Sequence, residues 1–195
     1  MKIGVDVDGV LFDTENFFRV ESLIFDVENG GKGEVNKEEC YFQYRFDWTE
    51  QEEIDFLAKC YEEVELNAPI MPSAKYVLNK LKEMGHELYI ITNRGSYFEN
   101  EVEITEKRLK EEGIDIFDGY YYYSKNKGEV CKNLKIDVMI DDLYENVEKV
   151  TNVGIKCLYY RDLVLKFFNH ELSHEVRNWA DIYYEIVNFD KWNKK

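Results

Sequence analysis

Two carboxylates separated by one residue follow the first apolar run of the chain. Ile3-Gly-Val-Asp-Val-Asp-Gly-Val10 places Asp6 and Asp8 at the end of a strand expected over residues 2–7. Because side chains alternate along a strand, both carboxylates would point to the same side. One can attack phosphorus while the other protonates the leaving oxygen and then activates water. Two Asp residues in an apolar run are costly without a cation, which argues against a plain acidic turn.

A second apolar run, residues 87–92, leads into three polar residues. Thr92, Asn93 and Arg94 follow one another there, before a glycine. The Thr92 hydroxyl and the backbone N–H groups after it could hold phosphate oxygens, and Arg94 could reach the substrate. The alternative is an ordinary turn in which Arg94 is a solvated surface charge.

Two lysines follow the next apolar run, residues 118–123. Lys125 and Lys127 lie in a polar loop, and Lys127 is closer to the start of an expected helix. A lysine at that place could neutralise a phosphate and the nucleophile together. We favour Lys127 as the phosphate lysine, with Lys125 as the alternative.

A second acidic pair closes the series. Asp141 and Asp142 come at the end of the apolar run 136–140 and just before a helix. Adjacent carboxylates repel one another unless a cation lies between them. Mg²⁺ prefers octahedral oxygen coordination, so we predict a Mg²⁺ site formed by Asp6, Asp8 through its backbone carbonyl, and the second pair, with Asp142 as the direct ligand.

These residues need a scaffold that brings the ends of distant strands together. Five β-rich apolar runs alternate with helical patterns, which predicts a Rossmann-like α/β fold with a parallel five-stranded sheet flanked by helices. The expected strands are residues 2–7, 87–92, 118–123, 136–140 and 155–160. The expected helices are one that Ser73 caps and that ends at Gly85, and those over residues 97–112 and 143–153.

The segment between the first two strands is much longer than one connection requires. We predict a core domain of residues 1–14 and 71–195, with a mostly helical cap over residues 15–70 that has its own small core. Its aromatic residues are Phe17, Phe18, Phe25, Tyr41, Phe42, Tyr44, Phe46, Trp48, Phe56 and Tyr61. Phe18, Tyr44 and Trp48 are candidates to contact a substrate, with the cap core as the alternative.

The composition excludes several classes of partner. The formal charge of −15 disfavours binding to a nucleic-acid polymer, which needs Lys and Arg to replace counterions. A small anionic substrate stays compatible, because a divalent cation can dominate the potential in one cleft. No apolar run reaches the length of a membrane span, and a strand beginning at residue 3 leaves no room for a leader, so we expect a cytoplasmic protein.

The cysteines and histidines do not suggest a second metal site. Cys40, Cys60, Cys131 and Cys157 are scattered without a CxxC pair, and we expect four reduced thiols. His170 and His174 are four residues apart on an expected helix but lack the glutamate of an HExxH motif. We interpret them as part of a solvated helical face.

The order of these motifs resembles the haloacid dehalogenase superfamily, over residues 3–142. In that superfamily the first Asp is the nucleophile, the second is the acid and base, Thr and Lys bind phosphate, and the last acidic pair supports Mg²⁺. By resemblance these roles fall to Asp6, Asp8, Thr92, Lys127, and Asp141 with Asp142. The dehalogenase members lack the second Asp of the first motif, so Asp8 favours a phosphatase.

Further motifs resemble the bacterial relatives of the cytosolic and mitochondrial 5′(3′)-deoxyribonucleotidases. They are Ile91-Thr-Asn-Arg94, Lys127-Gly-Glu-Val-Cys131, Val138-Met-Ile-Asp-Asp142 and Asn178-Trp-Ala-Asp-Ile-Tyr183. The resemblance implies a 5′-nucleotidase with an aspartyl-phosphate intermediate, in which cap aromatics lie against the base of a (deoxy)ribonucleoside monophosphate. Stacking on a base is typically about 1–3 kcal/mol, which is enough to matter for affinity.

Other functions stay open at this stage. One is a phosphatase or phosphomutase for sugar phosphates, whose cap would present polar groups instead of a stacking face. A signalling receiver domain also combines acidic residues, Mg²⁺, Thr and Lys, but its acidic pair comes first and its acceptor Asp later, the reverse of the order here. A catalytically silent binding protein is a further alternative, and the chain could form a homodimer.

Overall fold

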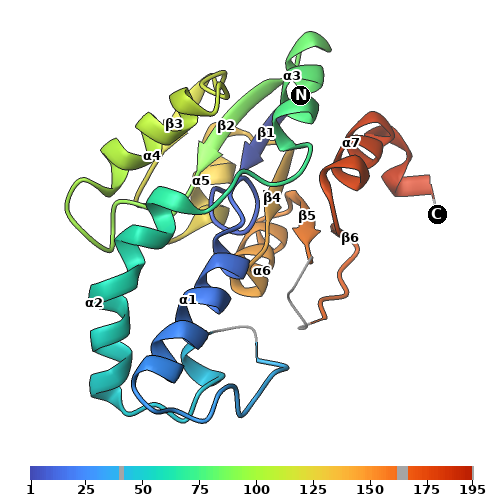
Figure 1. The fold of residues 1–195 in the computed structure, drawn as a ribbon. Helices are drawn as coiled ribbons and strands as arrows, with labels where there is room; N and C mark the ends of the chain where they lie inside the picture. The colour runs from blue at the N-terminus through green and yellow to red at the C-terminus, as the bar shows by residue number, and fades with distance from the viewer. Residues whose placement is uncertain (40–41, 162–166, 195) are drawn as a thin grey trace.

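The computed structural model describes residues 1–39, 42–161 and 167–194, and the fold is a parallel α/β sheet between helices (Figure 1). The sheet has the strand order β3-β2-β1-β4-β5-β6, with all neighbours parallel. The strands are β1 (Lys2–Val5), β2 (Glu87–Ile91), β3 (Gly119–Tyr121), β4 (Val138–Asp141), β5 (Lys156–Tyr160) and β6 (Ser173–Val176). This order is that of a Rossmann-like fold and confirms the predicted fold class.

Helices cover both faces of the sheet. They are α3 (Ala74–Glu83), α4 (Glu101–Glu111), α5 (Lys127–Leu134), α6 (Tyr144–Asn152) and α7 (Trp179–Val187), with a final 3₁₀ turn η2 (Phe189–Lys194). Neighbouring residues of one strand belong to opposite cores: Leu88 and Ile90 pack with α3 and α7, and Tyr89 and Ile91 pack with α5 and α6. The central residues of β1, β2, β4 and β5 are buried and mostly apolar, as is typical of parallel strands that are covered on both faces.

The prediction of five strands was wrong by one. β6 pairs with β5 at the edge of the sheet, and His174 lies in β6 and not on a helix. The segment Ser-His-Glu-Val is short and mostly polar, as an edge strand that faces solvent can be, and it carries no strong strand signal. The His174 Nδ1 atom lies 2.8 Å from Glu185 Oε2, and the imidazole stacks on Trp192.

The helix that follows Ser73 also differs in detail from the prediction. α3 begins at Ala74 as expected, but Ser73 has a left-handed backbone (φ 68°) and its side chain accepts no capping hydrogen bond. Asn126 and Asn178 do cap α5 and α7, because their side chains accept from backbone N–H groups in the first turn. The sequence therefore predicted the position of α3 but not its capping residue.

Two long helices project from the sheet on the side of the β1 carboxyl end (Figure 1). They are α1 (Thr14–Glu28) and α2 (Glu50–Asn67), and between them the described residues include one 3₁₀ turn, η1 (Phe42–Tyr44). The aromatic side chains of Phe25, Phe56, Phe18, Phe42 and Trp48 form a small core between these helices. We refer to α1, α2 and their connection as the cap.

The two chain segments that join the cap to the sheet lie side by side. Phe12 forms an antiparallel bridge with Ile70, and Asp13 N–H donates to the carbonyl of Pro69 at 2.8 Å. The Met71 N–H donates to the carbonyl of Leu11 at 2.8 Å. The cap is thus attached through one compact double connection.

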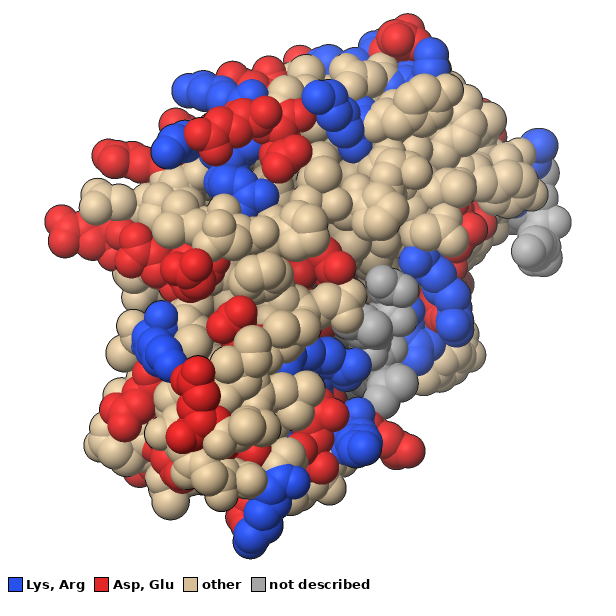
Figure 2. All heavy atoms as spheres, in the orientation of Figure 1, with Lys and Arg blue, Asp and Glu red and all other residues tan. Residues whose placement is uncertain are grey.

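The distribution of charged side chains on the surface agrees with the acidic composition of the chain. On the face in Figure 2, Lys and Arg are interspersed with the more numerous Asp and Glu. Within the described ranges, none of the helices combines the length and apolar character needed to cross a membrane. Cys60, Cys131 and Cys157 are buried and free, whereas Cys40, like Tyr41 of the cap, lies outside the described residues.

Candidate active site

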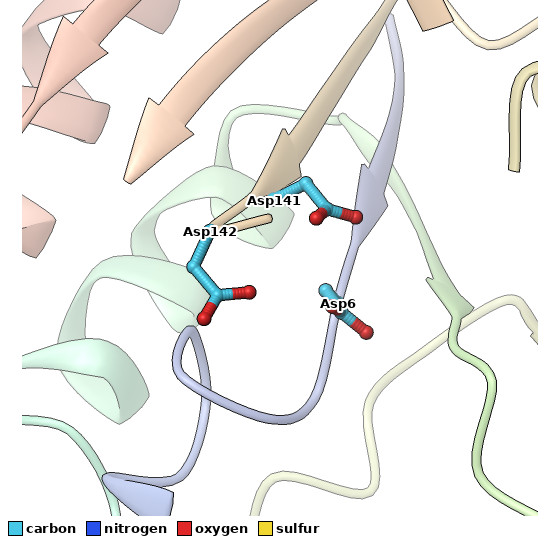
Figure 3. Close-up of side chains that lie close together, drawn as sticks. All are labelled: Asp6, Asp141 and Asp142. Atoms are coloured by element: carbon cyan, nitrogen blue, oxygen red, sulfur yellow. The ribbon is translucent and has the colours of Figure 1, made fainter. Parts of the chain in front are cut away.

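Three carboxylates lie at the topological switch point of the sheet, between β1 and β4. β1 and β4 are neighbours, and the chain runs outward from them in opposite directions, which is the place where open α/β sheets bind ligands. Asp6 follows β1, Asp141 ends β4, and Asp142 comes next. Figure 3 shows the three side chains close together, and one oxygen from each lies within 4.8 Å of the others.

Lys127 places its ammonium group between two of these carboxylates. Its Nζ atom lies 2.5 Å from Asp6 Oδ2 and 2.7 Å from Asp141 Oδ2. Lys127 is the first residue of α5 and is buried, whereas Lys125 is exposed at the edge of the cleft. Of the two lysines, only Lys127 touches the carboxylates.

Asp141 and Asp142 are neighbours in sequence but differ in their contacts. Asp141 Oδ1 accepts hydrogen bonds from the Leu143 N–H (3.0 Å) and from Asn146 Nδ2 (3.1 Å), and its other oxygen binds Lys127. Within the described part of the chain, no side-chain or backbone N–H donates a hydrogen bond to the Asp142 carboxylate, which lines the cleft. The geometry leaves Asp142 as the member of the pair with oxygens available to a cation.

The electrostatics of this cluster fit a divalent cation. Burial, together with the negative charges of Asp141 and Asp8, raises the pKa of Asp6 to about 7 despite the opposing effect of Lys127. Burial also raises the pKa of Asp142 well above its usual range, with added repulsion from Asp141 and Asp6. Three carboxylates against one ammonium leave an excess of negative charge, and a Mg²⁺ ion with its preference for oxygen ligands would balance it.

Gly9 lets the chain turn closely beneath Asp142. Its φ is +66°, which favours glycine, and a Cβ atom built there would lie 2.0 Å from Asp142 Oδ2. Any other residue would therefore push the Asp142 carboxylate away. This explains in physical terms why a glycine follows the pair of Asp6 and Asp8.

Asp8 is held by an arginine. Arg94 donates from Nε to Asp8 Oδ2 at 3.0 Å and from Nη2 to Asp8 Oδ1 at 2.6 Å, a two-pronged contact. The alternative of a solvated Arg94 is wrong, because its side chain is fully buried, although it borders the cleft. Asp8 itself is 39% exposed toward the cleft.

Thr92 and Asn93 stand at the carboxyl end of β2, as the sequence indicated. Thr92 is buried, and its Oγ1 atom accepts from the Arg94 N–H at 3.3 Å. Asn93 Nδ2 donates to the Tyr97 hydroxyl at 2.9 Å. Ser124, which the sequence did not single out, is buried beside them, and all three border the same cleft as Asp6.

One cleft of about 810 Å³ connects the carboxylates to the cap. Its apolar wall consists of Phe18, Phe42, Leu57, Ala58, Tyr61, Tyr97 and Phe98. Phe18, one of the three expected substrate contacts, is in this wall and stacks on Phe42. Tyr44 and Trp48 are not: Tyr44 is exposed outside the cleft, and Trp48 packs in the cap core and donates to Asp26.

Tyr97 and Phe98 were missed because they belong to the core domain and not to the cap. They follow the turn after β2, and their rings pack on Tyr61 of α2, at 5.1 Å and 6.1 Å between centroids. The aromatic pair that follows Arg94 after Gly95 and Ser96 was the available signal. The wall of the cleft is therefore built from both sides of the connection between cap and core.

Comparisons with known proteins agree with this geometry. The model of the family described as "5' nucleotidase, deoxy (Pyrimidine), cytosolic type C protein" matches residues 1–191. The Oceanobacillus iheyensis protein named "Putative nucleotidase OB0422" is 25% identical over 163 residues, which cover 81% of this chain and 85% of that protein.

Solved structures share the fold. The haloacid dehalogenase-like hydrolase SP0104 of Streptococcus pneumoniae matches at a TM-score of 0.63 and 14% identity, covering 97% of each chain. The haloacid dehalogenase-like protein ATU0790 of Agrobacterium tumefaciens matches at 0.69 and 13%, covering 97% of this chain and 98% of the other. The chain has the haloacid dehalogenase fold and belongs to the NT5C family of 5′-nucleotidases, which makes it a hydrolase.

Proposed function

We propose that this protein is a Mg²⁺-dependent phosphatase that hydrolyses (deoxy)ribonucleoside monophosphates through a phosphoryl-aspartate on Asp6. The observation that carries the proposal is the contact of Lys127 with both Asp6 and Asp141 beside the available carboxylate of Asp142. The nucleophile Asp6, the fixed ammonium group of Lys127 and a site for a divalent cation at Asp142 then face one cleft. Phosphoryl transfer requires this combination of positioning and charge stabilisation.

The nucleophile is Asp6. Asp6 Oδ1 accepts from the Val7 N–H at 2.8 Å, while Oδ2 is held by Lys127, so the orientation of the carboxylate is fixed. In the proposed reaction, a carboxylate oxygen attacks phosphorus in line with the leaving oxygen, and the P–O bond to the nucleoside breaks as the acyl phosphate forms. Lys127 offsets negative charge at the nucleophile and on the phosphoryl oxygens.

Asp8 transfers the protons. It protonates the leaving 5′-oxygen in the first step and takes a proton from the water that then hydrolyses the acyl phosphate. Its partial exposure toward the cleft and its fixation by Arg94 support this role. Thr92, Asn93 and Ser124 border the space in which the phosphate would lie.

Mg²⁺ would be held by Asp6, Asp142 and the backbone carbonyl of Asp8, with Asp141 keeping Lys127 in place. When bound, it would neutralise the phosphoryl oxygens as a Lewis acid. The excess negative charge of the carboxylate cluster and the raised pKa of Asp142 support this assignment.

The cleft favours a nucleotide over a sugar phosphate. Phe18, Phe42, Tyr61 and Tyr97 line the cleft, and aromatic side chains can stack on the π-face of a base. A sugar phosphate would instead need hydrogen-bonding groups on the cap side. Glu53 and Glu62 do border the cleft, so a substrate screen must include both classes.

A phosphate-release assay tests the function. Deoxy- and ribonucleoside 5′- and 3′-monophosphates would be compared with hexose and pentose phosphates, each with Mg²⁺ and with EDTA. We expect release that depends on Mg²⁺ and the largest kcat/KM for a nucleoside monophosphate. Release that survives complete metal removal would contradict the Mg²⁺ site, and a larger kcat/KM for a sugar phosphate would contradict the substrate class.

A further inference from the structure

We infer that Arg94 and Glu65 are positioning residues for Asp8, and that Glu65 links the orientation of this acid to the cap helix α2. This inference rests on the proposed function, because it assigns a role relative to the proton transfer by Asp8. Glu65 lies in the last turn of α2, and Arg94 follows β2 of the core. The contact between them joins the two parts of the protein directly behind the acid.

Arg94 has all of its side-chain nitrogens committed to protein groups. Nε and Nη2 bind both oxygens of Asp8, and Nη1 donates to Thr105 Oγ1 at 3.0 Å. The same Nη1 atom lies 3.5 Å from Glu65 Oε2. Because Thr105 and Glu65 hold the guanidinium in place, it sets the direction of the Asp8 carboxylate that it binds.

Glu65 and Glu101 form a buried acid pair behind Arg94. Glu65 is 2% exposed, Glu101 is 1% exposed, and neither oxygen of Glu65 receives a hydrogen bond from an N–H or hydroxyl donor in the described part of the chain. Burial raises the pKa of Glu65 to about 10 despite Arg94, and the neighbouring Asp8 and Glu101 carboxylates contribute to the increase. Burial among carboxylates therefore favours the protonated form of Glu65.

Glu101 holds the turn that follows Arg94. Its Oε2 atom accepts from the Gly95 N–H at 2.6 Å and from the Tyr97 N–H at 3.0 Å. The acid pair thus fixes both the guanidinium and the backbone that carries it. Tyr97, in the same turn, contributes to the cleft wall.

The end of α2 is also tied to the core next to this network. Arg108 of α4 donates to the carbonyls of Glu65 and Leu66 from Nη1 and to that of Ala68 from Nη2, at 2.6–3.0 Å. α2 also carries Tyr61 in the cleft wall. A displacement of α2 would therefore move a substrate-facing residue and the partner of Arg94 together, which couples occupation of the cleft to the orientation of Asp8.

The experiment compares two substrates that differ in their need for an acid. The leaving alkoxide of a nucleoside monophosphate requires a proton, whereas 4-nitrophenyl phosphate releases a stabilised phenolate. The kcat/KM ratio of the two is measured on the same sample, so it does not depend on the fraction of active protein. The variants are R94K, E65A and E65Q, with E63A as the control because Glu63 is exposed on the same helix.

We expect R94K to lower the nucleotide to nitrophenyl ratio at least about tenfold, since general acid catalysis contributes about 10²–10⁴. E65A should lower the ratio less, E65Q should restore most of that loss because Gln mimics the protonated acid, and E63A should leave it unchanged. Equal losses for both substrates in R94K and E65A would overturn the inference, because they indicate a merely structural or phosphate-binding role. A wild-type protein that hydrolyses neither substrate with Mg²⁺ would overturn the proposed function and the inference with it.

Discussion

Asp141 and Asp142 show how strongly local contacts separate two identical, adjacent residues. Both oxygens of Asp141 are occupied by Lys127, Asn146 and a backbone N–H, so this carboxylate serves to position the lysine. Asp142 faces the cleft and is crowded by Asp141 and Asp6. Its negative charge is unfavourable in the metal-free protein and favourable with a cation.

D142N should therefore have opposite effects on the metal-free and metal-bound protein. We expect a higher thermal midpoint without metal, because a repelled charge is removed, and Mg²⁺ binding weaker by at least about tenfold. Calorimetry and thermal unfolding with and without Mg²⁺ measure both effects. D55N, at an exposed position on α2, is the matched control. A D142N protein that loses metal-free stability and keeps its Mg²⁺ affinity would argue against this role.

The sequence was sufficient to predict which residues gather at the carboxyl edge of the sheet. Asp6, Thr92 and Asp141 stand at strand ends and Lys127 begins the helix after β3, and parallel strands bring these places to one edge whatever the details of packing. The partner of Arg94 could not be found, because its burial against Asp8 and Glu65 depends on groups far apart in the chain. The residue types in a sequence predict the members of a site more readily than they predict which side chains contact one another.

At the scale of elements, the cleft lies between the cap helices and the turn after β2. Tyr97 of that turn is 57% exposed and packs on Tyr61 of α2, while Tyr44 of η1 is 61% exposed and lies outside the cleft. The two tyrosines are similarly accessible but differ in position. Substituting each tyrosine in turn therefore distinguishes a loss of stacking in the cleft from a general effect of removing an exposed tyrosine.

Y97A should raise KM for a nucleoside monophosphate about tenfold with a smaller change in kcat, since base stacking is about 1–3 kcal/mol. Y44A should leave both constants unchanged. Steady-state kinetics of the two variants and of the wild type give the comparison. If Y44A and Y97A changed KM to the same extent, the assignment of the cleft wall would be wrong.

The end of α2 makes stability depend on pH. Glu65 binds its proton in the folded protein up to a pKa of about 10, whereas the unfolded chain releases it near the ordinary value of 4.5. The folded state binds more protons between these values, so Glu65 lowers the free energy of unfolding as pH rises from about 4.5 to 10. E65Q removes this contribution.

We expect the stability of E65Q relative to the wild type to increase with pH. Urea unfolding of the metal-free proteins at pH 6 and pH 9 measures it, and the matched E63A variant should show no such trend. A difference between E65Q and wild type that is the same at both pH values would contradict a protonated Glu65.

The elements themselves were predicted unevenly, for physical reasons. Buried parallel strands such as β1, β2 and β4 have apolar central residues, and glycines follow α3, α4 and α6, so both signals were clear. β6 was missed because a short, mostly polar edge strand is defined by its pairing with β5 and not by its residues. In the same way, Trp48 and Phe18 look alike in sequence and both pack in the cap core, but only Phe18 also borders the cleft.

The whole molecule is an acidic protein that we propose to act on an anionic substrate. Its net charge of −15 offers no general attraction to phosphate, so binding must rely on the local field of Lys127, a bound cation and oriented donors. The fold concentrates these groups at one edge of the sheet and places an aromatic cap above them. The cluster thus sets the reaction, and the cleft between cap and core sets the substrate.

The most direct test of this account is to trap the phosphorylated protein. A nucleoside monophosphate labelled in its phosphate is mixed with the protein and Mg²⁺, quenched in acid within one turnover, and the labelled peptide is mapped by mass spectrometry. We expect an acid-stable acyl phosphate on Asp6 that requires Mg²⁺ and is absent from D6N. Turnover without any label on Asp6, or a label on another residue that D6N retains, would contradict the account.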